Sequence, residues 1–329
     1  MINIDLSWQQ AAASTGCLAA VAAVLLRRSR VVALGQRPAD GPPARDDPPG
    51  AAAAQRARHA VTAARLAAAG GFVREAALVF ALFALWQFAG SFSVMGPDGA
   101  LGRARWLWHT ERVLRLPSET GLQRLVLPHP LIVQVCDLYY DILHFPVLLG
   151  CLVWLFARHR ERYSRFRNTL VAFTGLCLLI QLIPVAPPRM LPGIGMVDTA
   201  AVYGQSVYSA TRGFDADQLS AMPSVHVGWA ILVAVAVVGA RSRWRWLAVA
   251  YPIATSYAVV VTANHFWLDG LAAGAVLVAV LAAQAAARRL LAAHAGRAVP
   301  GGALSPAGET VPAGQSGIRA GTSSDLVGS

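Results

Sequence analysis

Six long apolar stretches limit the folds open to this chain. They cover roughly residues 75–93, 130–157, 169–186, 223–240, 246–263 and 265–288. A helix needs about 20 apolar residues to cross the hydrocarbon core of a bilayer, so each stretch is predicted to be a membrane helix. A shorter apolar run at 11–26 has arginines after it rather than before it, which favours a further span over a signal peptide. The predicted fold class is all-α: a polytopic membrane helical bundle with a six-helix core plus one extra N-terminal span.

The composition agrees with a membrane protein. Only 14% of the 329 residues are charged and 56% are hydrophobic, whereas soluble domains carry about a quarter charged residues. The net charge is +11 and the chain contains no lysine. Its arginines lie between apolar runs, where they indicate membrane topology and contacts with anionic lipids. We therefore expect membrane lipids as partners and no nucleic acid.

The arginines also predict an orientation. Clusters at 158–167, 241–245 and 288–289, and those following the first apolar run, share one side if the spans alternate. The positive-inside rule makes that side cytoplasmic. The C-terminus is then cytoplasmic and the N-terminus outside. The loop 187–222 and the junction 262–266 face the extracytoplasmic side, and we expect a multi-pass protein of the plasma membrane.

Four regions follow from this pattern. We expect an N-terminal span over 1–35, a flexible Arg/Pro/Ala-rich cytoplasmic loop over 36–73, a multi-helix membrane domain over 74–290 and a disordered tail over 291–329. Segment 93–129 combines aromatic and basic residues at helical spacing. That spacing fits a helix on the membrane surface or a solvated loop helix.

The first unusual polar motif is Ser220-Ala221-Met222-Pro223-Ser224-Val225-His226, just before an apolar run. Pro223 suits the first turn of a helix, which places Ser224 and His226 at a helix N-terminus on the outer side. Free N–H groups and the positive end of the helix dipole make such an end an anion site. His226 is then placed to give a proton to a phosphate ester. A polar cap on a membrane helix is the alternative.

The second motif runs from Thr262 to Gly270 and contains Asn264, His265 and Asp269. The spacing of His265 and Asp269 is i,i+4, which would place both on one helix face. An ionisable residue within a span is by default functional. A carboxylate at one imidazole nitrogen leaves the other nitrogen free as a nucleophile or base. A capping histidine over a satisfied carboxylate is the alternative.

Together the motifs suit phosphoryl transfer, with one histidine attacking phosphorus and the other protonating the leaving oxygen. Phosphate also needs cations. Arg189, in Pro187-Pro188-Arg189 at the exit of a span, is the main candidate, because guanidinium matches phosphate with two hydrogen bonds. It could equally be an ordinary interfacial arginine. Arg212 in the same loop is a weaker candidate.

A polar stripe lies within one predicted span. Asp137, Tyr140, Asp141 and His144 fall at i, i+3, i+4 and i+7 and would form a single inward face. They could line a head-group pocket, with Asn264, or support the two histidines. They could equally form a structural hydrogen-bond network between helices.

These residues resemble the type 2 phosphatidic acid phosphatase (PAP2) superfamily. The resemblance is carried by Ala221–His226, by Asn264–Asp269 and by Arg189, and it covers about residues 74–288. It implies a six-helix core, no metal or other cofactor, and a phosphohistidine intermediate. His265 would be the nucleophile, Asp269 its orienting partner and His226 the general acid, while Arg189 and Ser224 would bind phosphate.

Within the superfamily the chain is similar to the inositol phosphorylceramide synthase-like branch, through Tyr139-Tyr140, His144 and the Pro-Pro-Arg turn. Two cationic positions of the phosphatase pattern hold Leu182 and Ala258-Val259 instead, which favours that branch. The expected function is therefore a lipid phosphatase or phosphotransferase with water or an alcohol as acceptor. A transporter with a polar intramembrane relay, a non-catalytic relative, and a metal site at His226, His265 and Asp269 are the alternatives.

Overall fold

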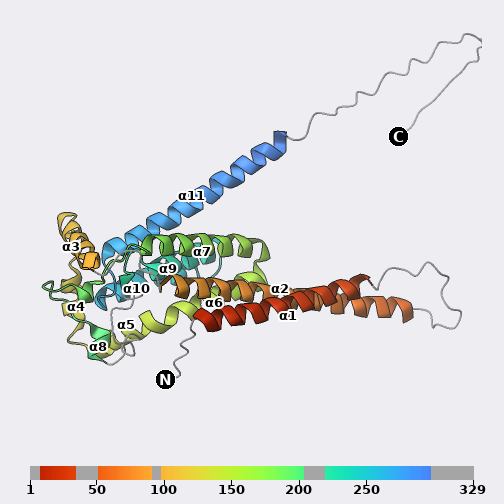
Figure 1. The fold of residues 1–329 in the computed structure, drawn as a ribbon, viewed down its shortest axis with the longest axis horizontal. Helices are drawn as coiled ribbons and strands as arrows, with labels where there is room; N and C mark the ends of the chain where they lie inside the picture. Colours follow the sequence, from red (N-terminus) through yellow and green to blue (C-terminus); the bar gives the residue numbers. More distant parts are fainter. Residues whose placement is uncertain (1–7, 35–50, 91–97, 204–218, 298–329) are drawn as a thin grey trace, which may run out of the picture. The chain divides into compact units, whose positions relative to one another are not determined.

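A computed structural model describes residues 8–34, 51–90, 98–203 and 219–297. The chain divides into two compact units, Met1–Gln284 and Ala285–Ser329. The helical bundle described below belongs to the first unit. The described residues are helical apart from turns and one isolated parallel bridge between Val185 and Ser220. The helices of Figure 1 are α1 (Trp8–Leu34), α2 (Ala51–Gly90), α3 (Asp98–Val113), α4 (Glu119–Val126), α5 (Pro130–Leu138), the π-helix η1 (Tyr139–Leu143), α6 (His144–Arg158), α7 (Arg160–Gln181), the 3₁₀ helix η2 (Pro188–Met190), α8 (Thr199–Val202), α9 (Val225–Gly239), α10 (Arg245–Val261) and α11 (Trp267–Arg297).

Three helical stretches in the described part of the chain are long and apolar enough to cross a membrane. They are Ala53–Leu85, Pro130–Arg158 and Trp267–His294. Two further helices, α9 and α10, are apolar but shorter. The all-α membrane architecture is thus confirmed, whereas the count of six plus one spans stays a prediction.

The N-terminal region differs from expectation. The segment 36–73 is not a loop throughout, because α2 already begins at Ala51 and runs without a break to Gly90. Alanine favours helix strongly, and residues 51–70 are rich in it. Helix α1 lies alongside α2 (Figure 1). At Gly70 an added Cβ would stand 2.9 Å from Leu26 Cγ, so the glycine permits this close approach.

The C-terminal boundary also moves. Helix α11 continues to Arg297, so the segment 291–297 is helical and not part of a disordered tail. Residues 298–329 lie outside the described residues.

The core of the bundle is formed where α6, α7, α9 and α11 meet. Phe173 of α7 is fully buried, and its ring occupies the space a side chain at residue 228 would need. A Cβ on Gly228 would stand 1.9 Å from Phe173 Cζ. The glycine therefore lets the first turns of α9 pack directly on α7, and this contact fixes the helix end that carries His226.

Helix α3 covers the end of the bundle near residues 184–191. Ala100, Ala104 and Leu107 are buried at i, i+4 and i+7, while Trp106 on the opposite face is 65% exposed. Arg103 Nε donates to the Pro184 carbonyl at 2.6 Å. The segment 93–129 thus contains a packed amphipathic helix, and its location relative to the membrane surface stays a prediction.

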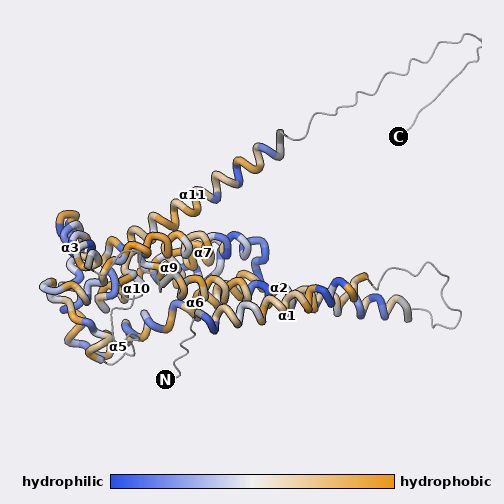
Figure 2. The backbone as a smooth tube through the Cα atoms, viewed as in Figure 1, coloured by the Kyte–Doolittle hydropathy of each residue, from blue (hydrophilic) through white to orange (hydrophobic). Residues whose placement is uncertain are grey.

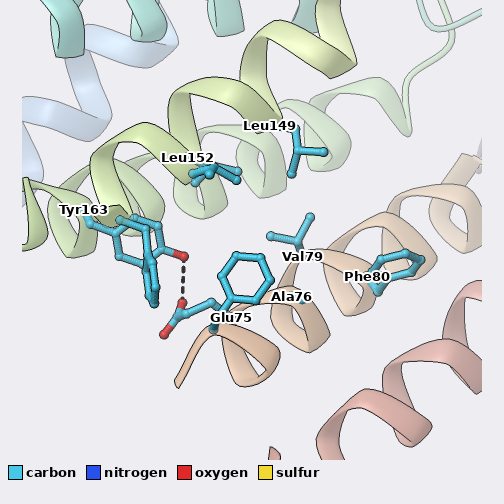
Figure 3. Close-up of a pocket in the computed structure, with 10 residues that line it drawn as sticks. Glu75, Ala76, Val79, Phe80, Leu149, Leu152 and Tyr163 are labelled. Atoms are coloured by element: carbon cyan, nitrogen blue, oxygen red, sulfur yellow. Dashed lines mark hydrogen bonds between the residues drawn. The ribbon is translucent and has the colours of Figure 1, made fainter. Parts of the chain in front are cut away.

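A buried charge cluster links α2 to α7. Glu75 accepts from Arg167 Nη1 at 2.8 and 2.6 Å and from the Tyr163 hydroxyl at 3.0 Å. Glu75 and Tyr163 also line an apolar pocket of about 80 Å³ between α2, α6 and α7 (Figure 3). Figure 2 shows polar residues at the α6–α7 connection beside this cluster. None of the predicted site residues line the pocket.

Candidate active site

The two histidine motifs meet at the N-terminal ends of α9 and α11. The backbone N–H of Ser224 donates to the Asp269 carbonyl oxygen at 3.0 Å. The ring centroids of His226 and His265 are 6.1 Å apart. No hydrogen bond joins the two rings among those of the described residues, and the Tyr140 ring lies close to both, at 4.6 and 6.3 Å. The site residues that the sequence predicted on separate helices are therefore brought together.

His265 is buried in the turn that joins α10 to α11. Its Nδ1 lies 2.8 Å from the Ala221 carbonyl oxygen and 3.3 Å from Asp269 Oδ2. A carbonyl oxygen can only accept, so these partners assign the proton to Nδ1. The other nitrogen, Nε2, then carries the lone pair that a nucleophile needs.

Asp269 has a different setting from the one predicted. Helix α11 begins at Trp267, so His265 lies before the helix and does not share a helix face with Asp269. The Asp269 carboxylate folds back over the first turn, where Oδ2 accepts the Phe266 N–H at 2.8 Å. The i,i+4 contact survives because this carboxylate caps the helix and faces the His265 ring at once.

His226 occupies the first turn of α9, as predicted. Its ring is half-buried and lies 4.6 Å from Tyr140 and 4.7 Å from His144 in centroid separation. His144 is 1% exposed, and its Nδ1 contacts the Tyr140 carbonyl at 3.2 Å. The His144 Nε2 has no hydrogen-bond partner among the described residues. The rings of Tyr140 and His144 thus pack against His226, and Tyr140 also lies 6.3 Å from His265 in centroid separation.

The polar stripe does not form one continuous face. A π-helical turn over Tyr139–Leu143 interrupts the α-helical register, and such turns often occur at functional sites. Tyr140 and His144 face the histidines, whereas Asp137 accepts from Thr199 Oγ1 of α8 at 2.8 Å. Asp141 is half-buried and interacts electrostatically with Arg189. Tyr140 and His144 therefore pack against His226, whereas Asp137 bonds to α8.

Arg189 lies beside the histidine turn. Its backbone N–H donates to the Ala263 carbonyl at 3.0 Å, and its Nη1 donates to Asn264 Oδ1. The Arg189 Nε lies 3.6 Å from Asp198 Oδ2, and the Arg189 side chain is only 7% exposed. A nearly buried guanidinium beside the His265 turn is suited to hold an anion. Asn264, predicted to line a head-group pocket, instead accepts a hydrogen bond from the Arg189 guanidinium.

Two other predicted phosphate ligands differ in outcome. Ser224 is the N-cap of α9: its Oγ accepts from Val227 N at 3.4 Å, and its own N–H is used by Asp269. Only its hydroxyl proton remains to donate to phosphate. Arg212 lies outside the described residues.

Sequence reasoning missed two partners. The Ala221 carbonyl is the nearest acceptor of His265, and a backbone group carries no sequence signal. Glu111 of α3 is fully buried, and its Oε1 accepts the Leu268 N–H at 2.7 Å. The sequence did carry one sign of the Glu111 contact, because Glu111 continues the buried apolar face of α3 formed by Ala104 and Leu107. In the described ranges, no group of three or more His, Cys, Asp or Glu residues is arranged to hold a metal ion.

Comparisons with known proteins identify one family. A family model described as the PAP2 superfamily matches residues 105–283. No curated protein and no solved structure matches the chain. The match spans α3 to α11 and so includes both histidine motifs and Arg189. The superfamily expected from the sequence is confirmed, and the inositol phosphorylceramide synthase-like branch stays a prediction.

Proposed function

The chain belongs to the PAP2 superfamily, and on that premise we propose that it transfers the phosphoryl group of a lipid phosphate through a phosphohistidine on His265. Superfamily membership and the apolar helices make it a membrane enzyme of phosphatase or phosphotransferase type. The observation that carries the finer proposal is the pair of acceptors at His265 Nδ1, Ala221 O at 2.8 Å and Asp269 Oδ2 at 3.3 Å.

In the first step, the Nε2 lone pair of His265 attacks phosphorus. The bond from phosphorus to the leaving oxygen breaks, and the leaving oxygen takes a proton from His226 as the alcohol departs. Phosphorylation at Nε2 makes the ring cationic while Nδ1 keeps its proton. The Asp269 carboxylate stabilises that cation, and the Ala221 carbonyl holds the ring orientation.

In the second step, His226 accepts a proton from the incoming hydroxyl. The hydroxyl oxygen attacks phosphorus, the phosphorus–nitrogen bond breaks, and His265 returns to its starting form. Water as acceptor gives free phosphate, whereas a lipid or polyol alcohol gives a new phosphoester. Arg189 neutralises the phosphoryl oxygens in both steps, and the Ser224 hydroxyl donates to them.

We further propose that the site opens on the extracytoplasmic side and that the acceptor is an alcohol, as in the inositol phosphorylceramide synthase-like branch. The positions of the arginine clusters support the orientation. The replacement of two phosphatase-pattern cations by Leu182 and Ala258-Val259 supports the branch.

The test uses purified full-length protein in detergent with a chelator present. Substrates are phosphatidic acid, a prenyl diphosphate, and phosphatidylinositol with ceramide or diacylglycerol. We expect turnover by the wild type and by His129→Ala, an exposed histidine at the α5 N-terminus, and none by His265→Ala. Free phosphate identifies a phosphatase, and a new phospholipid without free phosphate identifies a transferase. Equal inactivity of all three proteins across the panel contradicts the proposal.

A further inference from the structure

The first turn of α11 receives only half of a capping box from its own residues. The helix begins at Trp267, so Phe266 is the N-cap residue and Leu268 and Asp269 are the second and third helical positions. A capping box pairs the N-cap side chain with an N–H of the first turn, and the third side chain with the N-cap N–H. Asp269 supplies the second half by accepting the Phe266 N–H at 2.8 Å. Phenylalanine cannot supply the first half, because its side chain has no acceptor.

Glu111 of α3 occupies the position of the missing acceptor. Its Oε1 accepts the Leu268 N–H at 2.7 Å, across 157 residues of sequence. The Glu111 side chain is 0% exposed, as is that of Asp269. The turn that carries the carboxylate facing His265 is therefore capped from a different helix.

A second carboxyl supports this contact. Glu119, the first residue of α4, is 1% exposed and is paired with Arg112 Nη2. Glu111 Oε2 and Glu119 Oε1 are both buried, and neither has a hydrogen-bond partner among the described residues. A proton on one of the two carboxyls would let it donate to the other, because a protonated carboxyl donates while an ionised one accepts. Arg112 then balances the single negative charge.

We propose that Glu111, buried and bonded to the Leu268 N–H, is a positioning residue of the active site that holds Asp269 against His265 from outside the histidine motifs. This inference rests on the proposed function, because it assigns a role in the same phosphoryl transfer. Glu111 touches neither histidine and is not itself a catalytic residue.

The charges around Glu111 explain why it must be protonated. Burial, with the neighbouring Glu119 carboxyl, raises its pKa from the ordinary 4.5 to about 9. Arg112 Nη2 lies 4.0 Å from Glu111 Oε2 on the same helix, Glu119 faces it from α4, and Asp269 faces it from α11. Ionisation of Glu111 would place a second negative charge beside Glu119 and near Asp269. The pKa of Glu111 is higher in the folded than in the unfolded protein. Its protonated carboxyl therefore contributes fully to folding stability below about pH 4.5, and this contribution is lost as the pH rises to about 9.

The experiment compares three variants of the full-length protein at Glu111 and one control. Glu111→Gln keeps the Oε1 acceptor and replaces the shared proton with an amide N–H that does not titrate. Glu111→Ala removes the cap, and Glu111→Asp shortens it. The control is Gln123→Ala, which removes a buried α4 side chain that donates to the Val261 carbonyl of α10 and to the Val197 carbonyl before α8. Each protein is assayed for kcat and KM across pH 6–10, with thermal unfolding as the measure of folding.

We expect Glu111→Gln to keep kcat within a few-fold at pH 7 and to lose the wild-type fall in kcat near pH 9. We expect Glu111→Ala and Glu111→Asp to lower kcat by about 10- to 100-fold at similar KM, as for other residues that orient a catalytic group. Gln123→Ala should lower the unfolding temperature and leave the shape of the kcat–pH profile unchanged.

The inference is overturned if Glu111→Ala folds and keeps the wild-type kcat, or if Glu111→Gln keeps the same alkaline fall. Failure of Glu111→Ala to fold leaves the Glu111→Gln profile to decide. Inactivity of the wild type on every substrate is a separate result: it contradicts the proposed function, and the unfolding temperature of Glu111→Gln against wild type between pH 5 and 9 then tests the shared proton alone. If the unfolding temperatures of the two proteins depend on pH in the same way, the shared proton is refuted.

Discussion

The Ser224 N–H donates to the Asp269 carbonyl oxygen at 3.0 Å, and this bond joins the two histidine motifs directly. It connects the N-cap of α9 to the first turn of α11, and so links the helix end that carries His226 to the turn that carries His265. A backbone bond between the two helix ends limits how far the two histidines can separate.

Asp269→Asn should lower kcat strongly and change KM little. The amide can still accept the Phe266 N–H, but it lacks the charge that stabilises a cationic phosphohistidine at His265. Neutralising the equivalent carboxylate of a catalytic triad costs up to about 10⁴-fold, and we expect a loss of at least about 100-fold here. Steady-state kinetics measure it, with the exposed Glu161→Gln as the control. An unchanged kcat in Asp269→Asn would remove Asp269 from the mechanism.

Arg189→Lys should weaken substrate binding by about 10- to 100-fold, because a charge-assisted, forked contact with phosphate contributes about 1.5–3 kcal/mol and an ammonium cannot reproduce it. Asn264→Ala should have a smaller effect, because it removes only the amide that orients the Arg189 guanidinium. The readout is KM for the best lipid phosphate. An unchanged KM in Arg189→Lys would show that another cation holds the phosphate.

Gly228→Ala should destabilise the protein. The new methyl group would stand 1.9 Å from Phe173 Cζ, so α9 and α7 must separate, and overpacking of this kind costs about 1–3 kcal/mol. Gly175→Ala on α7 is the matched control, since an added Cβ there meets no atom within 4 Å. Thermal unfolding in detergent checks the difference. Equal unfolding temperatures would mean that the α7–α9 contact yields easily.

Arg167→Gln should lower stability and leave kcat near its wild-type value. It removes both hydrogen bonds that Arg167 Nη1 makes to Glu75 and leaves a nearly buried carboxylate without that partner. Loss of one member of a buried pair costs about 3–5 kcal/mol, and the 21% exposure of Arg167 places the expected loss at or below the lower end. Arg165→Gln, at an exposed position, is the control. A fall in kcat without a fall in unfolding temperature would contradict a purely structural role.

The proposed orientation predicts different labelling of two loops. Val197→Cys, 38% exposed before α8, should react with a membrane-impermeant maleimide in intact cells. Arg243→Cys in the α9–α10 loop should react only after the membrane is permeabilised. Cys17, Cys136, Cys151 and Cys177 are first replaced by serine. The reverse pattern would place the site on the cytoplasmic side.

The helical membrane architecture could be predicted because it follows from local composition. Long apolar runs cannot satisfy their backbone polar groups in a bilayer except as helices, and this holds whatever the helices pack against. The same argument fails for 51–73, where Arg56, Arg58 and Arg65 interrupt an alanine-rich stretch and the helix is continuous nonetheless. Its packing against α1 supplies stability that the segment's own sequence does not reveal.

The sequence by itself determined the superfamily, the helical class, and the candidate chemistry of His226, His265, Asp269 and Arg189, because these depend on residue type and short spacing. Only the tertiary structure decided which groups meet. The Ala221 carbonyl at His265 and the Glu111 cap at Leu268 join residues 44 and 157 positions apart. Backbone acceptors are identical at every residue, and a contact between distant segments depends on how helices pack, so no local pattern encodes either one.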